Sequence, residues 1–221
     1  ETPQELIPQF DLLKQTLQAL GIAVLSCQGY EADDILGAMG ELAKRNDCQA
    51  LLVTGDKDSL QLVGGPVKVL YTKRGISDTD LMDEEAVRAK MGVLPNRVAD
   101  LKGLMGDSSD NIPGVPGVGP KTAAKLLNQF GTLEEVLAHA DQAGGPKLRQ
   151  SLATYADQAR QSKFLATIDP NLPCTYTLEQ VRFAGVEPEI WSPIFADLGF
   201  QTLAKRLGLS GKKEESVILA V

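Results

Sequence analysis

Apolar and polar positions along the first hundred residues alternate between helical spacing and short apolar runs. The predicted elements are, in chain order, a helix over residues 4–20, a strand over 22–25, a helix over 31–44, a strand over 50–54, a short helix or turn over 59–63, a strand over 67–71, and helices over 83–91 and 95–104. Because helices and strands alternate, the pattern predicts an α/β fold with a mostly parallel sheet flanked by helices.

After residue 100 the strand pattern ends and the apolar spacing becomes helical. Helices are predicted over residues 122–130, 132–137 and 148–164, and an apolar stripe of Trp191, Ile194, Phe195 and Leu198 predicts a buried helix face. Glycine and charged residues over 208–215 suggest a linker, and residues 216–221 resemble the start of a strand. We therefore predict an α/β part over residues 1–100, a helical part over 101–207, and a linker with the start of a following domain over 208–221.

The composition is that of an ordinary globular protein, with 43% hydrophobic and 23% charged residues among 221. No apolar run approaches the roughly 18 residues of a membrane span, and the chain opens with polar and acidic residues, unlike a signal peptide. Three widely spaced cysteines predict a reducing, cytoplasmic setting without a disulfide framework. A single histidine and the lack of paired cysteines argue against a zinc site.

The formal net charge of −7 is unevenly distributed along the chain. Residues 31–110 carry 15 acidic and 10 basic side chains, whereas residues 111–163 carry six basic side chains and four acidic ones. The acidic excess coincides with motifs that cations could neutralise, and the mild basic excess lies where a phosphate backbone could bind.

Two acidic motifs follow the predicted strands over residues 22–25 and 50–54. Ligands of an open α/β sheet bind at the carboxyl ends of its strands, so we expect the two motifs to lie close together. Carboxylates repel one another at that range, and Mg²⁺ or Mn²⁺, which prefer oxygen ligands, would hold them. The acidic residues are Glu31, Asp33 and Asp34 in the first motif, and Asp56 and Asp58 in the second.

A third acidic pair is followed by a glycine-rich hairpin. Asp107 and Asp110 are three residues apart, so one helical turn would put them on the same face. Glycines allow a backbone to approach a phosphate closely, and Pro120 suits the first turn of a helix whose N-terminal amides could bind that phosphate. The predicted DNA-binding residues are Gly114, Gly117, Gly119, Lys121, Thr122 and Lys125.

Each motif also has an ordinary structural explanation. Acidic residues at 31–34 favour a helix N-terminus through the helix dipole, and those at 56–58 suit a solvated turn. Asp107 and Asp110 could cap helix ends, and the glycine hairpin could be a plain turn. The occurrence of all four motifs in one chain favours a metal site with a phosphate-binding hairpin.

Taken in order, these motifs closely resemble the 5′-nuclease domain of bacterial DNA polymerase I, in the flap endonuclease family. The motifs are Gly-Tyr-Glu-Ala-Asp-Asp at 29–34, Thr-Gly-Asp-Lys-Asp at 54–58, Gly-Asp-Ser-Ser-Asp-Asn-Ile at 106–112, and Gly-Val-Gly-Pro-Lys-Thr-Ala at 117–123. The resemblance runs from residue 1 to about residue 207. It implies a PIN/5′-nuclease-like sheet with metals at its edge, followed by a helix–three-turn–helix element that grips duplex DNA.

The resemblance also implies which residues act. The seven acidic residues named above would hold two Mg²⁺ or Mn²⁺ ions, and residues 112–123 would match the three-turn, where the family often binds K⁺. Set against the family, the chain starts after the first strand, two further site acids and a basic arch. We therefore expect an N-terminally incomplete monomer, continued into the rest of a polymerase and weakly active or inactive by itself.

The chemistry predicted from the motifs and the resemblance is metal-dependent hydrolysis of phosphodiester bonds in 5′-flap, nicked or 5′-ended duplex DNA, during replication and repair. A metal-bound water would be the nucleophile, so no catalytic side chain is expected beyond the metal ligands, and the hairpin would contact the backbone and not the bases. Two other functions remain open, a non-catalytic duplex-binding module and a Mg²⁺-dependent phosphohydrolase of small molecules. The hairpin disfavours the second, because a small substrate needs no duplex grip.

Overall fold

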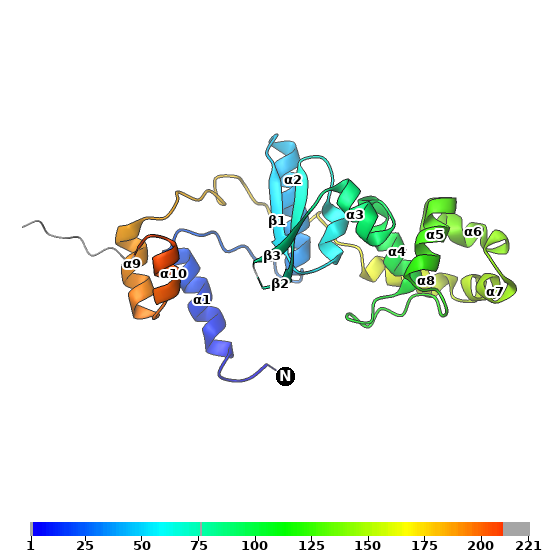
Figure 1. The fold of residues 1–221 in the computed structure, drawn as a ribbon, viewed down its shortest axis with the longest axis horizontal. Helices are drawn as coiled ribbons and strands as arrows, with labels where there is room; N and C mark the ends of the chain where they lie inside the picture. The colour runs from blue at the N-terminus through cyan, green and yellow to red at the C-terminus, as the bar shows by residue number, and fades with distance from the viewer. Residues whose placement is uncertain (1, 76, 210–221) are drawn as a thin grey trace, which may run out of the picture. The chain divides into compact units, whose positions relative to one another are not determined.

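The computed structural model describes residues 2–75 and 77–209 (Figure 1). The chain divides into two compact units, one made of Glu1–Leu25 with Tyr176–Val221 and the other of Ser26–Thr175. No helix in the described residues is both long enough and apolar enough to cross a membrane. The predicted linker beyond residue 209 and the predicted strand over 216–221 lie outside the described residues.

The larger unit contains a three-stranded sheet in the order β1, β2, β3. Strand β1 (Ala50–Thr54) pairs in parallel with β2 (Val67–Arg74), and β2 pairs antiparallel with β3 (Asp78–Met82). Leu52, Val69 and Met82 face one another across the three strands and are all buried. Side chains alternate across a strand, so this row is the face of the sheet that turns towards the core.

Helix α2 (Ala32–Arg45) packs against the buried face of the sheet, alongside β1 and β2 (Figure 1). Its Gly40 allows this approach, because a Cβ there would lie 3.4 Å from the side chain of Val67. A short 3₁₀ helix, η1 (Asp58–Leu62), follows β1 and contacts α2. The start of α2 and the end of β1 are thereby held on the same side of the core.

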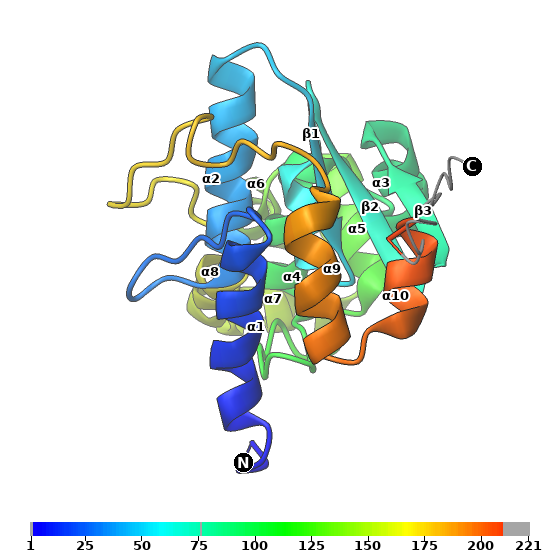
Figure 2. The same ribbon diagram turned by 90° about the vertical axis from the view of Figure 1, so that its left-hand side faces the viewer.

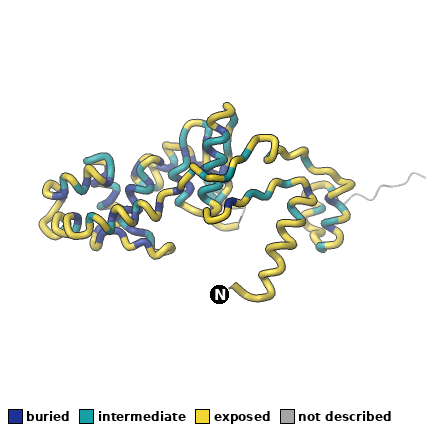
Figure 3. Tube along the Cα trace, turned by 180° about the vertical axis from the view of Figure 1, so that it is seen from behind, coloured by how far each residue is buried: buried dark blue, intermediate teal, exposed yellow. Residues whose placement is uncertain are grey.

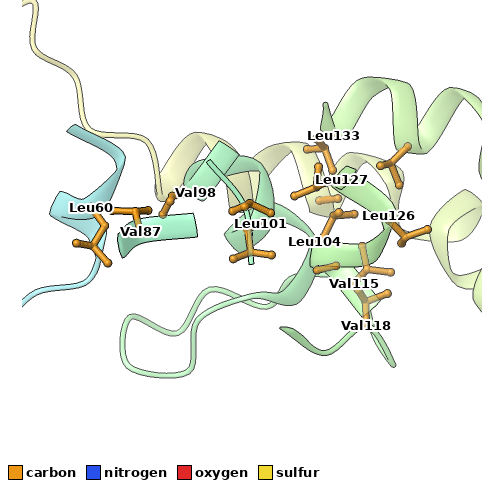
Figure 4. Packing of buried hydrophobic residues seen from close by; sticks show 14 of the residues in the cluster. Leu60, Val87, Val98, Leu101, Leu104, Val115, Val118, Leu126, Leu127 and Leu133 are labelled. Carbon is orange, nitrogen blue, oxygen red and sulfur yellow. The ribbon is translucent and has the colours of Figure 1, made fainter. Parts of the chain in front are cut away.

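Helices continue from the sheet through the rest of the larger unit. They are α3 (Glu84–Met91), η2 (Pro95–Arg97), α4 (Val98–Met105), α5 (Pro120–Phe130), α6 (Leu133–Ala138), η3 (Ala140–Gln142), α7 (Pro146–Thr154) and α8 (Ala156–Leu165). Helix α4 is central, since it contacts η1 as well as α5, α6 and α8. Buried residues from Leu60 through Leu101 and Leu104 to Leu133 form one continuous core along it (Figure 4).

The smaller unit consists of α1 (Ile7–Ala19), α9 (Pro188–Asp197) and α10 (Gln201–Arg206), which lie together (Figure 2). Its core holds Leu20, Trp191 and Phe195, and the rings of Trp191 and Phe195 are 5.6 Å apart. The predicted apolar stripe therefore does form a core. Helix α1 buries no residue and is exposed along most of its length (Figure 3).

The sheet differs from the prediction in two strands. Residues 22–25 form no strand among the described residues, because an apolar run becomes a strand only where a neighbouring strand accepts its backbone hydrogen bonds. Strand β3 was not predicted, since its polar sequence Asp-Thr-Asp-Leu-Met lacks a strong apolar alternation. The α/β class is confirmed, and the sheet is mixed, with one parallel and one antiparallel pairing.

Two further predictions were wrong. The single helix over residues 148–164 is broken at Tyr155, which ends α7 and precedes α8 with backbone angles of φ −107° and ψ 23°. A disulfide joins Cys27 to Cys174, where no disulfide was expected. An odd number of cysteines does not exclude one pair with one free thiol, here Cys48, and the paired residues are 147 positions apart, so only the fold brings them together.

Candidate functional site

The turn after β1 directs one carboxylate inward and leaves another exposed. The hydroxyl of Thr54 accepts a hydrogen bond from the Asp56 main-chain N–H at 3.0 Å, and the Asp56 carboxylate accepts one from the Asp58 N–H at 2.9 Å. These bonds close the turn tightly, and η1 begins at Asp58. The Asp58 side chain is consequently only 15% exposed, whereas Asp56 is exposed to solvent.

Asp107 and Asp110 lie on a tight loop and not on the helical turn that was predicted. Helix α4 ends at Gly106, with φ +74°, and the main chains of Asp107 and Ile112 then exchange two hydrogen bonds of 2.8 Å. The Asp107 carboxylate accepts hydrogen bonds from the main-chain N–H and the hydroxyl of Ser109. The loop turns Asp110 back towards Asp107, so the two acids are close without a helix.

Three of the predicted acids converge. Oxygen atoms of Asp58, Asp107 and Asp110 all lie within 4.8 Å of one another, which is close enough to hold a single cation. A cavity of about 770 Å³ is lined by the 55–58 turn and the 105–109 segment. Carboxylate oxygens are hard ligands of the kind that Mg²⁺ and Mn²⁺ prefer, and the group contains no histidine or cysteine. The donor set therefore fits either of these ions.

The first acidic motif starts α2 and lies apart from that trio. Glu31 and Asp34 form a capping box, and Asp34 also accepts a hydrogen bond from the Asp169 main-chain N–H at 2.9 Å. Asp33 is half-buried, with the Ser59 hydroxyl 3.5 Å from its carboxylate. These acids line a second cavity of about 600 Å³, and Asp58 lines both cavities. Asp58 thus connects the two acidic groups.

Burial and neighbouring charges shift two of the carboxyl groups in opposite directions. Partial burial raises the pKa of Asp33, and the nearby charge of Asp56 raises it further. Partial burial also opposes ionisation of Asp107, but hydrogen bonds from Lys102 and Ser109 outweigh it and lower the pKa of Asp107 to about 2. Asp107 is therefore ionised at neutral pH. A neighbouring cation would favour the ionised form of Asp33.

The glycine hairpin leaves the acidic loop and is fixed to the helices behind it. Gly114 has φ +62°, and a Cβ there would lie 2.1 Å from the main-chain nitrogen of Gly106, so no side chain fits. Gln158 donates to the carbonyl of Gly114 at 2.6 Å, and Ser151 donates to the carbonyl of Pro116 at 2.6 Å. The hairpin is consequently a rigid part of the helical region.

The exposed side of the hairpin carries most of the predicted DNA-binding residues. Gly117, Gly119, Lys121 and Lys125 are exposed, while Thr122 is half-buried. Gly119 caps α5, and Pro120 is its first residue, so the N-terminal amides of this helix open towards solvent. Lys121 and Lys125 are one turn apart on that helix. The sixth predicted residue, Gly114, is buried and shapes the hairpin from within.

Sequence reasoning missed Lys102, which is 2% exposed and pairs with both Asp58 and Asp107. It also missed the buried carboxylate of Asp100, which pairs with Lys163 at 2.6 Å. Both residues lie in α4, whose other residues are mostly apolar and buried. A charged side chain in so short and apolar a helix was the available signal, because such groups are buried only when they are paired.

Two family models match consecutive parts of the chain. The 5′-3′ exonuclease N-terminal resolvase-like domain matches residues 1–92, and the 5′-3′ exonuclease C-terminal SAM fold matches residues 93–189. DNA polymerase I of Bacillus caldotenax is 43% identical over 215 residues, which are 97% of this chain and 24% of the relative. The chain therefore spans about a quarter of the length of the curated relatives it matches.

Solved structures share the fold. A bacteriophage T5 flap endonuclease in a pseudo-enzyme-product complex with DNA and metal ions has a TM-score of 0.60 at 20% identity, over 90% of this chain and 63% of that one. The catalytic core of Rad2 in complex with a DNA substrate has a TM-score of 0.58 at 17% identity, over 95% of this chain and 71% of that one. With both family models and the DNA polymerase I relatives in agreement, the chain belongs to the 5′-3′ exonuclease family.

Proposed function

We propose that this chain is a structure-specific 5′-nuclease module that hydrolyses phosphodiester bonds in 5′-flap or 5′-ended duplex DNA with the help of divalent cations. The observation that carries the proposal is the convergence of Asp58, Asp107 and Asp110, whose carboxylate oxygens lie within 4.8 Å of one another. Asp107 and Asp110 directly precede the glycine hairpin in the chain. Family membership and the DNA and metal ions named for similar structures support the same reading.

Asp58, Asp107 and Asp110 would hold one Mg²⁺ or Mn²⁺ ion, and the acids Glu31, Asp33, Asp34 and Asp56 would contribute to a second ion nearby. When bound, such ions lower the pKa of a water molecule and stabilise the leaving oxygen of a phosphodiester. The shared position of Asp58, which lines both cavities, supports a link between the two groups. Within this proposal no side chain has to act as a nucleophile.

The hairpin and α5 would bind the DNA backbone. The exposed glycines allow a phosphate to approach the main chain, the helix N-terminus offers amide donors, and Lys121 and Lys125 add positive charge. A K⁺ ion at the hairpin would support the same contact. Backbone contacts fix the position of a duplex without reading its sequence, which suits an enzyme that recognises DNA structure. We further propose a monomeric, cytoplasmic module that works as part of a DNA polymerase.

Cleavage of a labelled 5′-flap duplex, with and without Mg²⁺ or Mn²⁺, tests the proposal. Metal-dependent release of the flap that is lost in Asp58→Asn supports hydrolysis at this centre. Binding of the duplex without cleavage at any metal concentration, both by this chain and by a full-length DNA polymerase that contains it, would instead favour a non-catalytic duplex-binding module. Absence of both binding and cleavage would contradict the proposal altogether.

A further inference from the structure

Lys102 brings a positive charge into the centre of the acidic trio. Its side chain, from the middle of α4, is one of the largest fully buried side chains of the described residues. The ammonium pairs with Oδ1 of Asp58 and, at 2.6 Å, with Oδ2 of Asp107. A buried lysine of this kind is stable only when its charge is matched by carboxylates.

The charges of this group leave room for one divalent ion. Asp58, Asp107 and Asp110 carry three negative charges when ionised, and Lys102 supplies one positive charge. The remaining charge of −2 equals that of a single Mg²⁺ or Mn²⁺ ion with its sign reversed. The ammonium therefore already provides part of the cationic charge that the trio needs.

We infer that Lys102 is an internal counter-ion that competes with the divalent cation for Asp58 and Asp107, and so weakens the binding of metal at the proposed centre. This inference rests on the proposed metal-dependent function. An ion held by the trio would lie beside the ammonium, because the ammonium contacts two of the three carboxylates. Like charges at such a distance disfavour each other strongly in a partly buried site.

Lys102 could instead assist metal binding by holding the carboxylates in place, but other contacts already fix the Asp107 carboxylate and the turn that carries Asp58. The main-chain N–H of Asp58 donates to Asp56, and the carboxylate of Asp107 accepts two hydrogen bonds from Ser109. The loop that carries Asp107 is closed by its two main-chain bonds to Ile112. These contacts keep the Asp107 carboxylate oriented and the turn that carries Asp58 in place when the ammonium is removed, so the loss of repulsion is expected to dominate.

The test is a calorimetric titration of Mn²⁺ into the wild-type chain and into Lys102→Met and Lys102→Gln. We expect both variants to bind Mn²⁺ roughly tenfold more tightly or better, which corresponds to about 1.4 kcal/mol of binding free energy. Lys163→Met is the matched control, since Lys163 also pairs with a buried carboxylate, that of Asp100, away from the trio. Its Mn²⁺ affinity should equal that of the wild type.

Unfolding in urea, without metal and with Mn²⁺, gives a second readout. The Lys102 variants should be less stable than the wild type without metal, because two acids then face each other unpaired, and Mn²⁺ should raise their unfolding midpoint more than that of the wild type. A variant that folds only when Mn²⁺ is present supports the inference. A variant that stays unfolded at saturating Mn²⁺ would overturn it, because the ammonium would then be irreplaceable by a divalent ion.

The two hypotheses fail differently in this experiment. Wild-type binding of Mn²⁺ that depends on Asp110, combined with equal or weaker binding by folded Lys102 variants, overturns the role of Lys102 and leaves the metal centre intact. Failure of the wild type and of both Lys102 variants to bind Mn²⁺ overturns the metal centre, and the inference with it.

Discussion

The carboxylate of Asp100 and the ammonium of Lys163 lie 2.6 Å apart and tie α4 to α8. The Asp100 side chain is 3% exposed and also accepts a hydrogen bond from the main-chain N–H of Leu133, at the start of α6, at 3.1 Å. One buried carboxylate therefore joins three helices around the segment that presents Lys102. This junction holds α4, α6 and α8 together.

Asp100→Ala is expected to lower the free energy of unfolding by about 3 kcal/mol, because it leaves a buried amide and a lysine without their partner. Urea unfolding monitored by circular dichroism measures the loss. Asp157→Ala is the control, since the Asp157 side chain is 100% exposed in its pair with Arg160, and it should not change stability measurably. Equal effects of the two substitutions would contradict the role of the buried junction.

The low pKa of Asp107 predicts a loss of stability in acid when metal is absent. Its pKa falls from the ordinary aspartate value to about 2 in the folded chain, so the ionised form contributes stability above pH 4 that is lost as the pH falls through 2. The contribution at neutral pH is about 2 kcal/mol. Unfolding in EDTA between pH 2 and 6 should therefore have a shallower pH dependence in Asp107→Asn.

Ser109→Ala is a variant of intermediate effect for the same experiment. It removes the hydroxyl that donates to Asp107 and leaves the main-chain donor and Lys102 in place. An intermediate pH dependence is expected. A pH profile of Asp107→Asn that coincides with the wild-type profile would show that other carboxylates account for the acid sensitivity.

The hairpin glycines should differ sharply in their tolerance of a methyl group. Gly114→Ala would place a Cβ 2.1 Å from a main-chain atom of Gly106, and we expect a loss of about 3 kcal/mol or more, or failure to fold. Gly117 has φ +82° in open space, so its alanine variant should lose about 1 kcal/mol from backbone strain alone. Gly119 has φ −92° and nothing nearby, so Gly119→Ala should lose only about 0.5 kcal/mol, because alanine caps a helix less well than glycine. Thermal unfolding of the three variants checks this order.

Lys121→Ala should weaken duplex binding equally for all sequences. Lys121 is exposed in the first turn of α5, where it can neutralise a phosphate but cannot read a base. Loss of one phosphate contact should reduce the slope of log affinity against log salt concentration by about 1. Lys44, an exposed lysine in the last turn of α2 and outside the basic region, serves as the control. A sequence-dependent loss for Lys121→Ala would argue against a backbone contact.

The sequence was informative where chemistry and periodicity coincide. The amphipathic pattern over residues 31–44 predicted α2, and glycine with proline at 119–120 predicted the start of α5. Glu31 and Asp34 were expected at the start of a helix, and they form its capping box. These features are local, so a single sequence carries them.

The rest depends on partners that are distant in the sequence. Strand β3 exists because β2 pairs with it, and Cys27 meets Cys174 only in the folded chain. The juxtaposition of Asp58 with the 107–110 loop, and the insertion of Lys102 between them, require the packing of α4 against η1. No spacing rule along the chain specifies such contacts, although a lysine within an apolar helix indicates a buried and paired charge.

Titration of Mn²⁺ into the chain, with Asp58→Asn and Asp110→Asn as variants and Asp141→Asn as control, measures whether the acidic trio binds a divalent cation. Asp141 is an exposed acid in η3, outside the trio. We expect the wild type and Asp141→Asn to bind Mn²⁺ alike, and each of the other two variants to bind about tenfold more weakly or worse, since each loses a charged ligand. Unchanged affinity in both Asp58→Asn and Asp110→Asn would contradict a metal centre formed by the acidic trio.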